Sequence, residues 1–321
     1  MKWQIIASGL LYILFVSGRA VAAPDAVDVP VLAGEWIKIA DSAPDVSPYN
    51  NPPRHNACDF SIWQAADGTW QMVACIRETS HPGRTRLFHR WESPALFAPD
   101  WAPKGIFATS DPQIGHVEGR MQAPHCFKHN GKYYFFYNSN GAHCMISDDG
   151  KTFRHHKDVR GSYTFFKMGR DVQLFKDGER WIAYYCARGM TARTAPALEG
   201  PWSEQEIDIA VTGNPESPFV LRHDDKYYLW QQMFVYVSSD PLKFPDSPIT
   251  KMTPGWSHGK YAPEIIESNG QFYVAGYGRG IWLAKMKWEK KAAEEIEQWR
   301  ATELKAIREH SARSQTKETA K

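Results

Sequence analysis

The chain has 321 residues, of which 43% are hydrophobic and 13% aromatic. This length provides a core for one large domain or two small ones. The 38 Lys and Arg residues nearly balance the 36 Asp and Glu residues, so no strong basic field exists to attract nucleic acid. Aromatic-rich sequence interrupted by Gly and Pro favours β-strands.

The first 22 residues have the features of a signal peptide. Lys2 gives a positive start, residues 5–16 form an apolar run, and Ala20-Val21-Ala22 is a small-residue cleavage site. The run is too short to favour a membrane span. We therefore expect a secreted or periplasmic protein with no membrane association after cleavage. Cleavage would remove Lys2 and Arg19 and leave a net charge of zero, which is compatible with a neutral ligand such as a sugar.

The five cysteines are an odd number, so at least one thiol is free or pairs with another chain. Their spacing contains no zinc-binding pattern. A two-residue turn at Asp67-Gly68 would place Cys75 opposite Phe60 rather than opposite Cys58. Cys58–Cys75 is thus a weak candidate for a disulfide, and the sequence does not decide whether any disulfide forms.

From residue 56 onward, period-two segments separated by turns recur about every 50 residues, a period typical of propellers and solenoids. Five hairpins can be aligned by their tight turns and the aromatic strands that follow. They span residues 59–73, 124–137, 171–185, 216–230 and 263–274. A third strand follows each hairpin. These units predict an all-β fold, a five-bladed β-propeller over residues 23–285.

The two ends of this domain carry different signals. Residues 23–34 are expected to be an extended lead-in, and Trp36–Ile39 to supply the last strand of the fifth blade, which removes an exposed edge. Residues 286–321 are rich in Lys, Glu, Ala and Arg and predict a C-terminal helical tail, partly disordered at its end. Ala292, Ile296 and Trp299 share one helical face, so Trp299 is expected to lie against the propeller. A solvated tail and a partner-binding helix both remain open.

Three acids precede the aromatic return strands at similar distances. Asp59, Asp171 and Glu216 stand 11, 10 and 11 residues before the first aromatic residue. A propeller would bring such positions together at one end of its axis, which predicts a shared site. Each acid taken alone is as well explained as a cap or turn former.

The ordered set of Asp59, Arg170-Asp171 and Glu216-Ser217-Pro218 resembles glycoside hydrolase family 43 and the related five-bladed enzymes of family 32. The resemblance covers about residues 50–288, and Glu199-Gly200-Pro201-Trp202 supports it. It implies that Asp59 is the general base, or the nucleophile of a retaining enzyme. Asp171 would orient the acid, favour its protonated form and bind sugar hydroxyls. Glu216 would be the general acid, and the wider carboxyl spacing of an inverting enzyme is expected.

Further residues are candidates for substrate contact at the same end of the propeller axis, its mouth. Arg170 could bind sugar hydroxyls or pair with an acid, and His125 and Glu264 occupy equivalent places in their hairpins. Trp63 and Trp230 are candidate sugar platforms, with core packing as the alternative. By the same resemblance, His258 would face an axial water or a structural calcium ion.

The sequence therefore predicts a secreted glycoside hydrolase that acts on an oligosaccharide or polysaccharide and requires no cofactor. A non-catalytic carbohydrate-binding propeller and a partner-binding propeller are the alternatives. The sugar, the linkage, exo or endo cleavage and the oligomeric state are not determined by the sequence.

Overall fold

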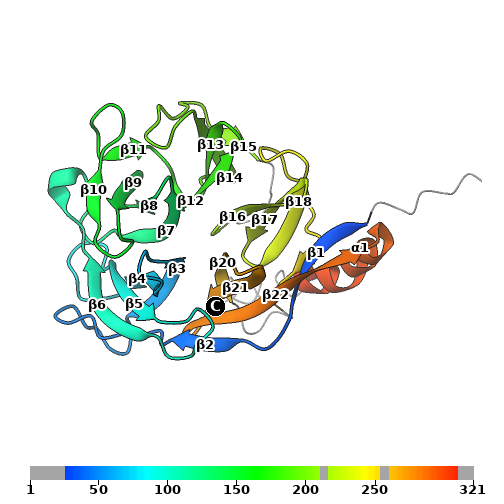
Figure 1. Cartoon of the computed structure of the whole chain (residues 1–321), viewed down its shortest axis with the longest axis horizontal. Coiled ribbons are helices and arrows are strands. Elements are labelled where there is room, and N and C mark those ends of the chain that lie inside the picture. The colour runs from blue at the N-terminus through cyan, green and yellow to red at the C-terminus, as the bar shows by residue number, and fades with distance from the viewer. Residues whose placement is uncertain (1–25, 210–215, 254–259, 310–321) are drawn as a thin grey trace, which may run out of the picture.

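The computed structural model describes residues 26–209, 216–253 and 260–309, and these form five antiparallel sheets around one axis (Figure 1). The expected five-bladed propeller is confirmed. The first three blades follow one another along the chain. Blade one consists of β3 (Asn56–Gln64), β4 (Trp70–Arg77), β5 (Leu87–Ser93) and β6 (Ala102–Ala108). Blade two consists of β7 (Gln122–His129), β8 (Lys132–Asn138), β9 (Ala142–Ser147), β10 (Arg154–His156) and β11 (Thr164–Phe166). Blade three consists of β12 (Arg170–Asp177), β13 (Arg180–Cys186), β14 (Met190–Ala195) and β15 (Ile207–Asp208).

The last two blades differ in how they are completed. Blade four runs outward in chain order, whereas the outer strands of blade five come from the start of the chain. Blade four consists of β16 (Phe219–His223), β17 (Lys226–Gln231), β18 (Phe234–Ser238) and β19 (Thr250–Lys251). Blade five consists of β20 (Tyr261–Ser268), β21 (Gln271–Tyr277), β22 (Ile281–Lys291), β1 (Val27–Leu32) and β2 (Ile37–Ala40).

Apolar side chains bury both faces of every blade. On β17, Tyr227 and Leu229 pack in the cluster between blades three and four, while Tyr228 and Trp230 pack between blades four and five. Because successive side chains of a strand point to opposite faces, each strand serves two clusters. One such cluster fills each of the five gaps between neighbouring blades. This explains the aromatic content of the sequence.

Ring closure uses more chain than expected. Residues Val27–Leu32, within the segment predicted to be an extended lead-in, form β1 and pair with β22 from Val27↔Lys291 to Leu32↔Met286. The expected closing segment is also paired, as β2 against the first part of β22. Strand β22 therefore runs well past residue 286, where the helical tail was expected to begin. Trp288 fixes this strand, because its ring stacks on His223 of blade four at 3.9 Å.

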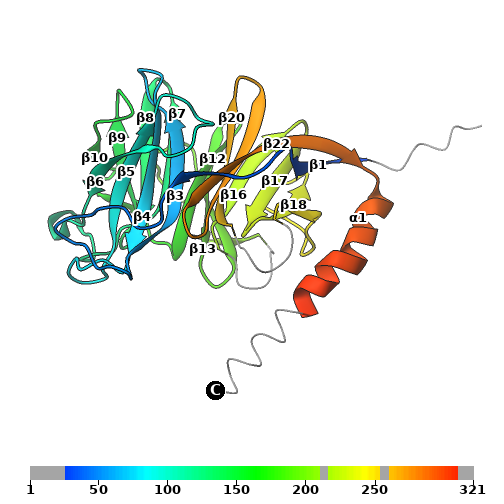
Figure 2. The same ribbon diagram turned by 90° about the horizontal axis from the view of Figure 1, so that it is seen from below.

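The helical tail begins at α1 (Ala293–Trp299) and continues through a π-helical segment, η2 (Arg300–Leu304). It slants down from the end of β22 on the outside of the ring (Figure 2), and Arg300 donates hydrogen bonds to the carbonyl oxygens of Ser247 and Pro248 of blade four. Ile296 and Leu304 are its buried residues, whereas Trp299 is only half-buried. The contact with the propeller that was expected from Trp299 is thus made mainly by Ile296. No helix of the described residues is long and apolar enough to cross a membrane.

All five cysteines are buried and free. Cys58 lies directly opposite Cys75, which differs from the register expected from a two-residue turn. The turn sets the pairing of Phe60 with Ala74, because the connection between the paired residues Gln64 and Trp70 is longer than two residues; a bulge between Cys58 and Phe60 then shifts the register by one further residue. Despite this pairing the two thiols form no disulfide, and the Cys58 thiol points to the carbonyl oxygen of Cys75 at 3.6 Å.

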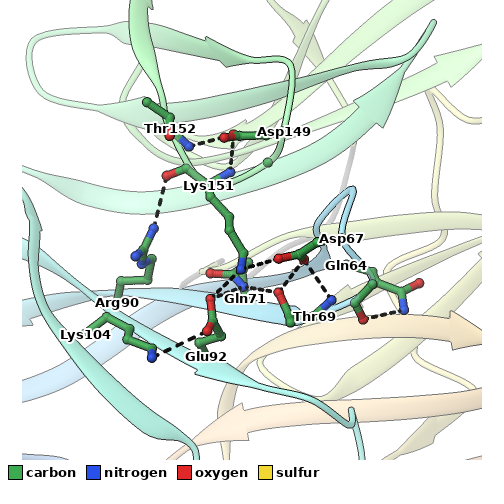
Figure 3. A network of polar contacts seen from close by, with 12 residues as sticks. Gln64, Asp67, Thr69, Gln71, Arg90, Glu92, Lys104, Asp149, Lys151 and Thr152 are labelled. Carbon is green, nitrogen blue, oxygen red and sulfur yellow. Dashed lines mark hydrogen bonds and ion pairs between the residues drawn. The ribbon is translucent and has the colours of Figure 1, made fainter.

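Blades one and two are also joined by polar contacts at the end of the strands opposite to Asp59. Lys151 Nζ lies 2.5 Å from Asp67 Oδ2 and 2.8 Å from Glu92 Oε2 (Figure 3). Asp149, in the turn before Lys151, accepts hydrogen bonds from the backbone N–H groups of Lys151 and Thr152. These contacts of the turn connect the two blades and are structural.

Candidate active site

The innermost strands share one irregularity at the same end of the axis. The regular ladder is interrupted in β3, β7, β12 and β20. Residues at the interruptions, and Ser217 just before β16, mostly have a left-handed backbone, with φ of 45° at Ala123, 60° at Asp171, 52° at Ser217 and 49° at Ala262. Such a conformation is uncommon outside glycine. Its recurrence turns the start of each innermost strand toward the axis.

These residues enclose a cavity of about 30 Å³ on the axis. Every blade contributes to its lining. The lining residues are Asp59, Phe60, Ala123, Pro124, Asp171, Val172, Ser217, Pro218, Ala262, Pro263 and Glu264. Two of the three predicted catalytic acids therefore line the cavity itself, and Glu216 stands directly beside it in the chain.

Asp59 lies in the bulge of β3. Burial raises the pKa of its carboxyl, and the charge of Glu216 raises it further. The guanidinium of Arg86 opposes both effects and favours the ionised carboxylate. Asp59 and Glu216 are thus close enough to interact electrostatically although 157 residues separate them in the sequence.

Asp171 is 9% exposed at the corresponding position of blade three. Its Oδ2 accepts a hydrogen bond from the backbone N–H of Ser217 at 3.1 Å. Burial raises the pKa of Asp171, and the nearby charge of Asp59 adds to the effect. Asp171 and Asp59 form a buried pair in which the ionisation of one disfavours the ionisation of the other.

Glu216 is held differently from the two aspartates. Its side chain is 38% exposed, and its Oε1 lies 2.7 Å from Nη2 of Arg170. Gln232 donates a hydrogen bond to its Oε2 at 3.1 Å. Ser217, and not Glu216, has the left-handed backbone conformation that Asp171 has in blade three. Glu216 therefore occupies the position in its blade that Arg170 occupies in blade three. The similar spacing of the three acids from the aromatic strands does not reflect equivalent positions.

Glu264 and His125 lie deeper along the axis than the aspartates. Ser61 donates a hydrogen bond to Glu264 Oε2 at 3.3 Å, and burial raises the pKa of Glu264 well above its usual range. His125 Nε2 lies 3.3 Å from the carbonyl oxygen of Leu174, and burial lowers its pKa to about 4. His125 does not line the cavity. The substrate contact expected of His125 is therefore not seen, and the side chain contacts the protein backbone instead.

Two further expectations about aromatic residues are corrected. Trp63 is 5% exposed and donates its indole N–H to the carbonyl oxygen of Gly150 at 2.8 Å. Trp230 is fully buried between blades four and five. Neither ring can stack on a sugar at the mouth, because the core already covers both. Blade packing, the alternative reading of these residues, is what the structure shows.

His258 lies outside the described residues. Around the axis the described part of the chain offers Glu264 and Ser61, together with Gln173 Oε1, a buried acceptor with no hydrogen-bond partner there. Oxygen donors of this kind suit water or calcium. These residues are compatible with the structural calcium ion that the resemblance implies.

Several arginines near the carboxyls were not identified from the sequence. Arg77 ends β4, Arg86 precedes β5, and Arg120 precedes β7, all at the end of the strands where Asp59 lies. Arg120 donates a hydrogen bond to Gln122, beside the axial cavity. The available signal was positional, since each arginine flanks a strand at its mouth end.

The fold is a five-bladed β-propeller with three carboxyls gathered at one end of its axis. No family model matches the sequence, and no curated protein sequence matches it. Solved structures of glycoside hydrolase families 43 and 117 share the fold.

Three of these structures illustrate the similarity, each at low sequence identity. An α-L-arabinofuranosidase from Clostridium thermocellum is 14% identical with a TM-score of 0.56, and the match covers 74% of this chain and 93% of that enzyme. A family 117 hydrolase from Zobellia galactanivorans is 12% identical with a TM-score of 0.54, covering 79% and 90%. A β-xylosidase/α-arabinofuranosidase from a compost metagenome, solved with xylotriose, is 14% identical with a TM-score of 0.52, covering 80% and 98%.

Proposed function

We propose that this protein is a glycoside hydrolase that cleaves oligosaccharides or polysaccharides at the axial mouth. The observation that carries the proposal is the convergence of Asp59, Asp171 and Glu216 from three separate blades. Burying several like charges together costs stability, and a purely structural role would not require it. The shared fold of solved glycoside hydrolases supports the same reaction class.

We assign the roles from the environment of each carboxyl. Asp59 lies beside Arg86, which favours its ionised form, and it would remove a proton from the attacking water. Glu216 is the more exposed acid and would donate a proton to the leaving glycosidic oxygen as the bond to the anomeric carbon breaks. Asp171 would bind sugar hydroxyls and, through Ser217, fix the backbone beside Glu216. By resemblance to family 43, we propose inversion at the anomeric carbon.

The ion pair of Arg170 with Glu216 gives this scheme a requirement. Both carboxyl oxygens of Glu216 are already engaged, Oε1 by the guanidinium of Arg170 at 2.7 Å and Oε2 by Gln232. Substrate must therefore draw Arg170 away before Glu216 can act as an acid. A sugar hydroxyl or substituent that accepts from the guanidinium would do this, which assigns Arg170 to substrate binding.

The roles can be tested with leaving groups of different basicity. Glu216→Gln should lose about 10²–10⁴-fold in kcat/KM on a nitrophenyl glycoside, but much less on the dinitrophenyl analogue, because that leaving group needs no proton. Asp59→Asn should lose activity equally on both. A panel of arabinosides, xylosides, galactosides and fructosides finds the sugar, and Glu118→Gln is the control for an exposed acid at the same end.

The results separate hydrolysis from binding. If dinitrophenolate restores Glu216→Gln no better than Asp59→Asn, the acid and base are assigned wrongly. If every variant keeps the activity of the wild type, the reaction occurs elsewhere on the protein. If the wild type binds sugars but cleaves no glycoside, it is a carbohydrate-binding propeller. The anomer first formed, read by NMR, tests inversion.

We also propose that the protein is exported, by cleavage after Ala22. The support is the signal-like sequence of residues 1–22, which lie outside the described part of the structure. Mass spectrometry of the protein from its native host should show a mature chain that starts at Ala23. An intact Met1 in the mature protein would contradict export by this route.

A further inference from the structure

Arginines gather at the mouth of the propeller from several blades. The strands run so that the end of β4 and the starts of β5, β7 and β12 lie at the end that carries Asp59. Arg77, Arg86, Arg120 and Arg170 flank these strand ends. The backbone N–H groups of Arg84 and Arg86 bond the carbonyl oxygens of Glu118 and Gly119, which ties the two loops of this region together.

Four of these arginines form no ion pair with a carboxylate in the described part of the chain, namely Arg77, Arg84, Arg86 and Arg120, whereas Arg170 is paired with Glu216. Arg77 donates to the amide oxygen of Asn56 at 2.8 Å. Burial lowers the pKa of Arg120, and the like charges of Arg84 and Arg86 lower it further. The charge of Asp59 acts on Arg86 and Arg77, but no carboxylate of the described residues contacts the four guanidinium groups directly, which suits them to bind an anion.

A pocket of about 590 Å³ opens beside Asp59, between blades one and five. Its lining combines cations with aromatic rings. The side chains that matter are Arg77, Lys260, Arg279, Tyr261, Tyr277 and Trp282. Burial raises the pKa of the Tyr277 phenol, and the nearby charge of Asp59 raises it further. The pocket is large enough for a sugar residue, and it has no acid in its lining.

Acids at the opposite end of the axis are paired with cations. Beside the turns of the innermost hairpins, Asp67 lies next to Lys151, Asp177 next to Arg180 and Asp225 next to Lys226. The pocket between blades one and five differs from that end, because its cations have no acid among the residues that line the pocket with them.

We propose that the mouth binds an anionic saccharide, one whose sugar residue beside the cleaved bond carries a carboxylate or a sulfate ester. The inference rests on the proposed glycoside hydrolase function and names its substrate class. The planar fork of an arginine matches both oxyanions in a bidentate manner. Arg77 lines the pocket and Arg120 lies at the same end of the axis in blade two, where it donates to Gln122; Tyr261 and Tyr277 offer aromatic surface to the sugar ring.

Binding of matched sugars tests this without requiring turnover. Calorimetric titrations would compare galactose with galacturonate, for the carboxylate, and with galactose 6-sulfate, for the sulfate. We expect at least one anionic sugar to bind about tenfold or more tightly than galactose, with an affinity that falls as NaCl rises. Arg77→Gln combined with Arg120→Gln should weaken that binding by about 10- to 100-fold. Arg222→Gln, in an exposed hairpin at the far end, is the matched control and should change nothing.

The outcomes distinguish this inference from the function on which it rests. Equal binding of galactose and both anionic sugars, failure of all three to bind, or a preference that survives the double variant would overturn it. If neutral aryl glycosides are cleaved and anionic sugars are not preferred, the hydrolase stands and the anionic substrate is refuted. If anionic sugars bind through the arginines but no glycoside is cleaved, the binding site stands and the hydrolase fails.

Discussion

The buried histidines of blade two give a prediction of pH-dependent stability that can be worked out in advance. His143 and His116 stand 4.5 Å apart between ring centroids, and His155 lies 5.7 Å from His116. Burial lowers the pKa of His143 to about 3, and the charges of His116 and His155 contribute to the shift. Its Nδ1 has no hydrogen-bond partner among the described residues. We predict that His143→Phe protects the protein against acid.

The magnitude follows from linkage. His143 stays neutral in the folded protein until about pH 3, whereas the unfolded chain takes up a proton below about pH 6.5. The free energy of unfolding therefore has its full value above about pH 6.5, and it decreases as the pH falls toward the pKa of His143 in the folded protein. Each pH unit costs about 1.4 kcal/mol, so His143 costs the wild type about 2 kcal/mol at pH 5 and about 0.2 at pH 7. Phenylalanine does not titrate and avoids this cost.

Urea unfolding of wild type and variant at pH 7, 6 and 5 measures the effect. The difference in unfolding free energy, variant minus wild type, should become more favourable by about 2 kcal/mol between pH 7 and pH 5. Comparing differences cancels the packing cost of the substitution and the titration of every other group. Phe165→Leu, a packing change in the same blade, should give the same difference at both pH values. A pH-independent difference for His143→Phe would refute the reasoning, because it would mean that His143 can be protonated in place.

Three other substitutions test the polar and apolar contacts of the fold. Burial raises the pKa of Glu264, and the stability that its proton provides is lost as the pH rises, so Glu264→Gln should raise the melting temperature more at pH 8 than at pH 5. Lys151→Met removes the cation beside Asp67 and Glu92 and should cost up to about 1 kcal/mol in urea unfolding, less in high salt. Ile296→Ser should cost about 2–5 kcal/mol and loosen the tail to proteolysis.

The blades could be predicted because their signals are local. Asn130-Gly131, Asp177-Gly178 and the equivalent turns fix each hairpin within a few residues, and period-two apolar residues mark the strands. The end of β22 could not be predicted in this way. Residues 286–291 have helix-like composition, and it is the stacking of Trp288 on His223, a residue of another blade, that accompanies their strand conformation. Contacts between distant segments leave no local pattern in the sequence.

The candidate site could likewise be predicted only in part. The acids were visible because they precede recognisable strands, but their backbone environment was not. Ala123 and Ala262 adopt a left-handed conformation without the glycine that usually signals it. The longer turn and the bulge at Asp59 also changed the register of the first hairpin from the expected one. The arginines of the mouth were missed because net charge averages over the whole chain, whereas a substrate meets only one end of the molecule.

The pairing of β1 with β22 has a consequence for how the protein is made. Val27 among the first described residues bonds across to Lys291 near the last, so β1 stays without its partner until almost the entire chain has been synthesised. Closing so long a loop costs little more than closing a shorter one, but non-local pairing of this kind is slow. A nascent chain halted before residue 281 would lack the partner of both β1 and β2 and would leave an open ring. Synthesis from one end to the other therefore makes the first blade early and the fifth blade, which needs both ends, last.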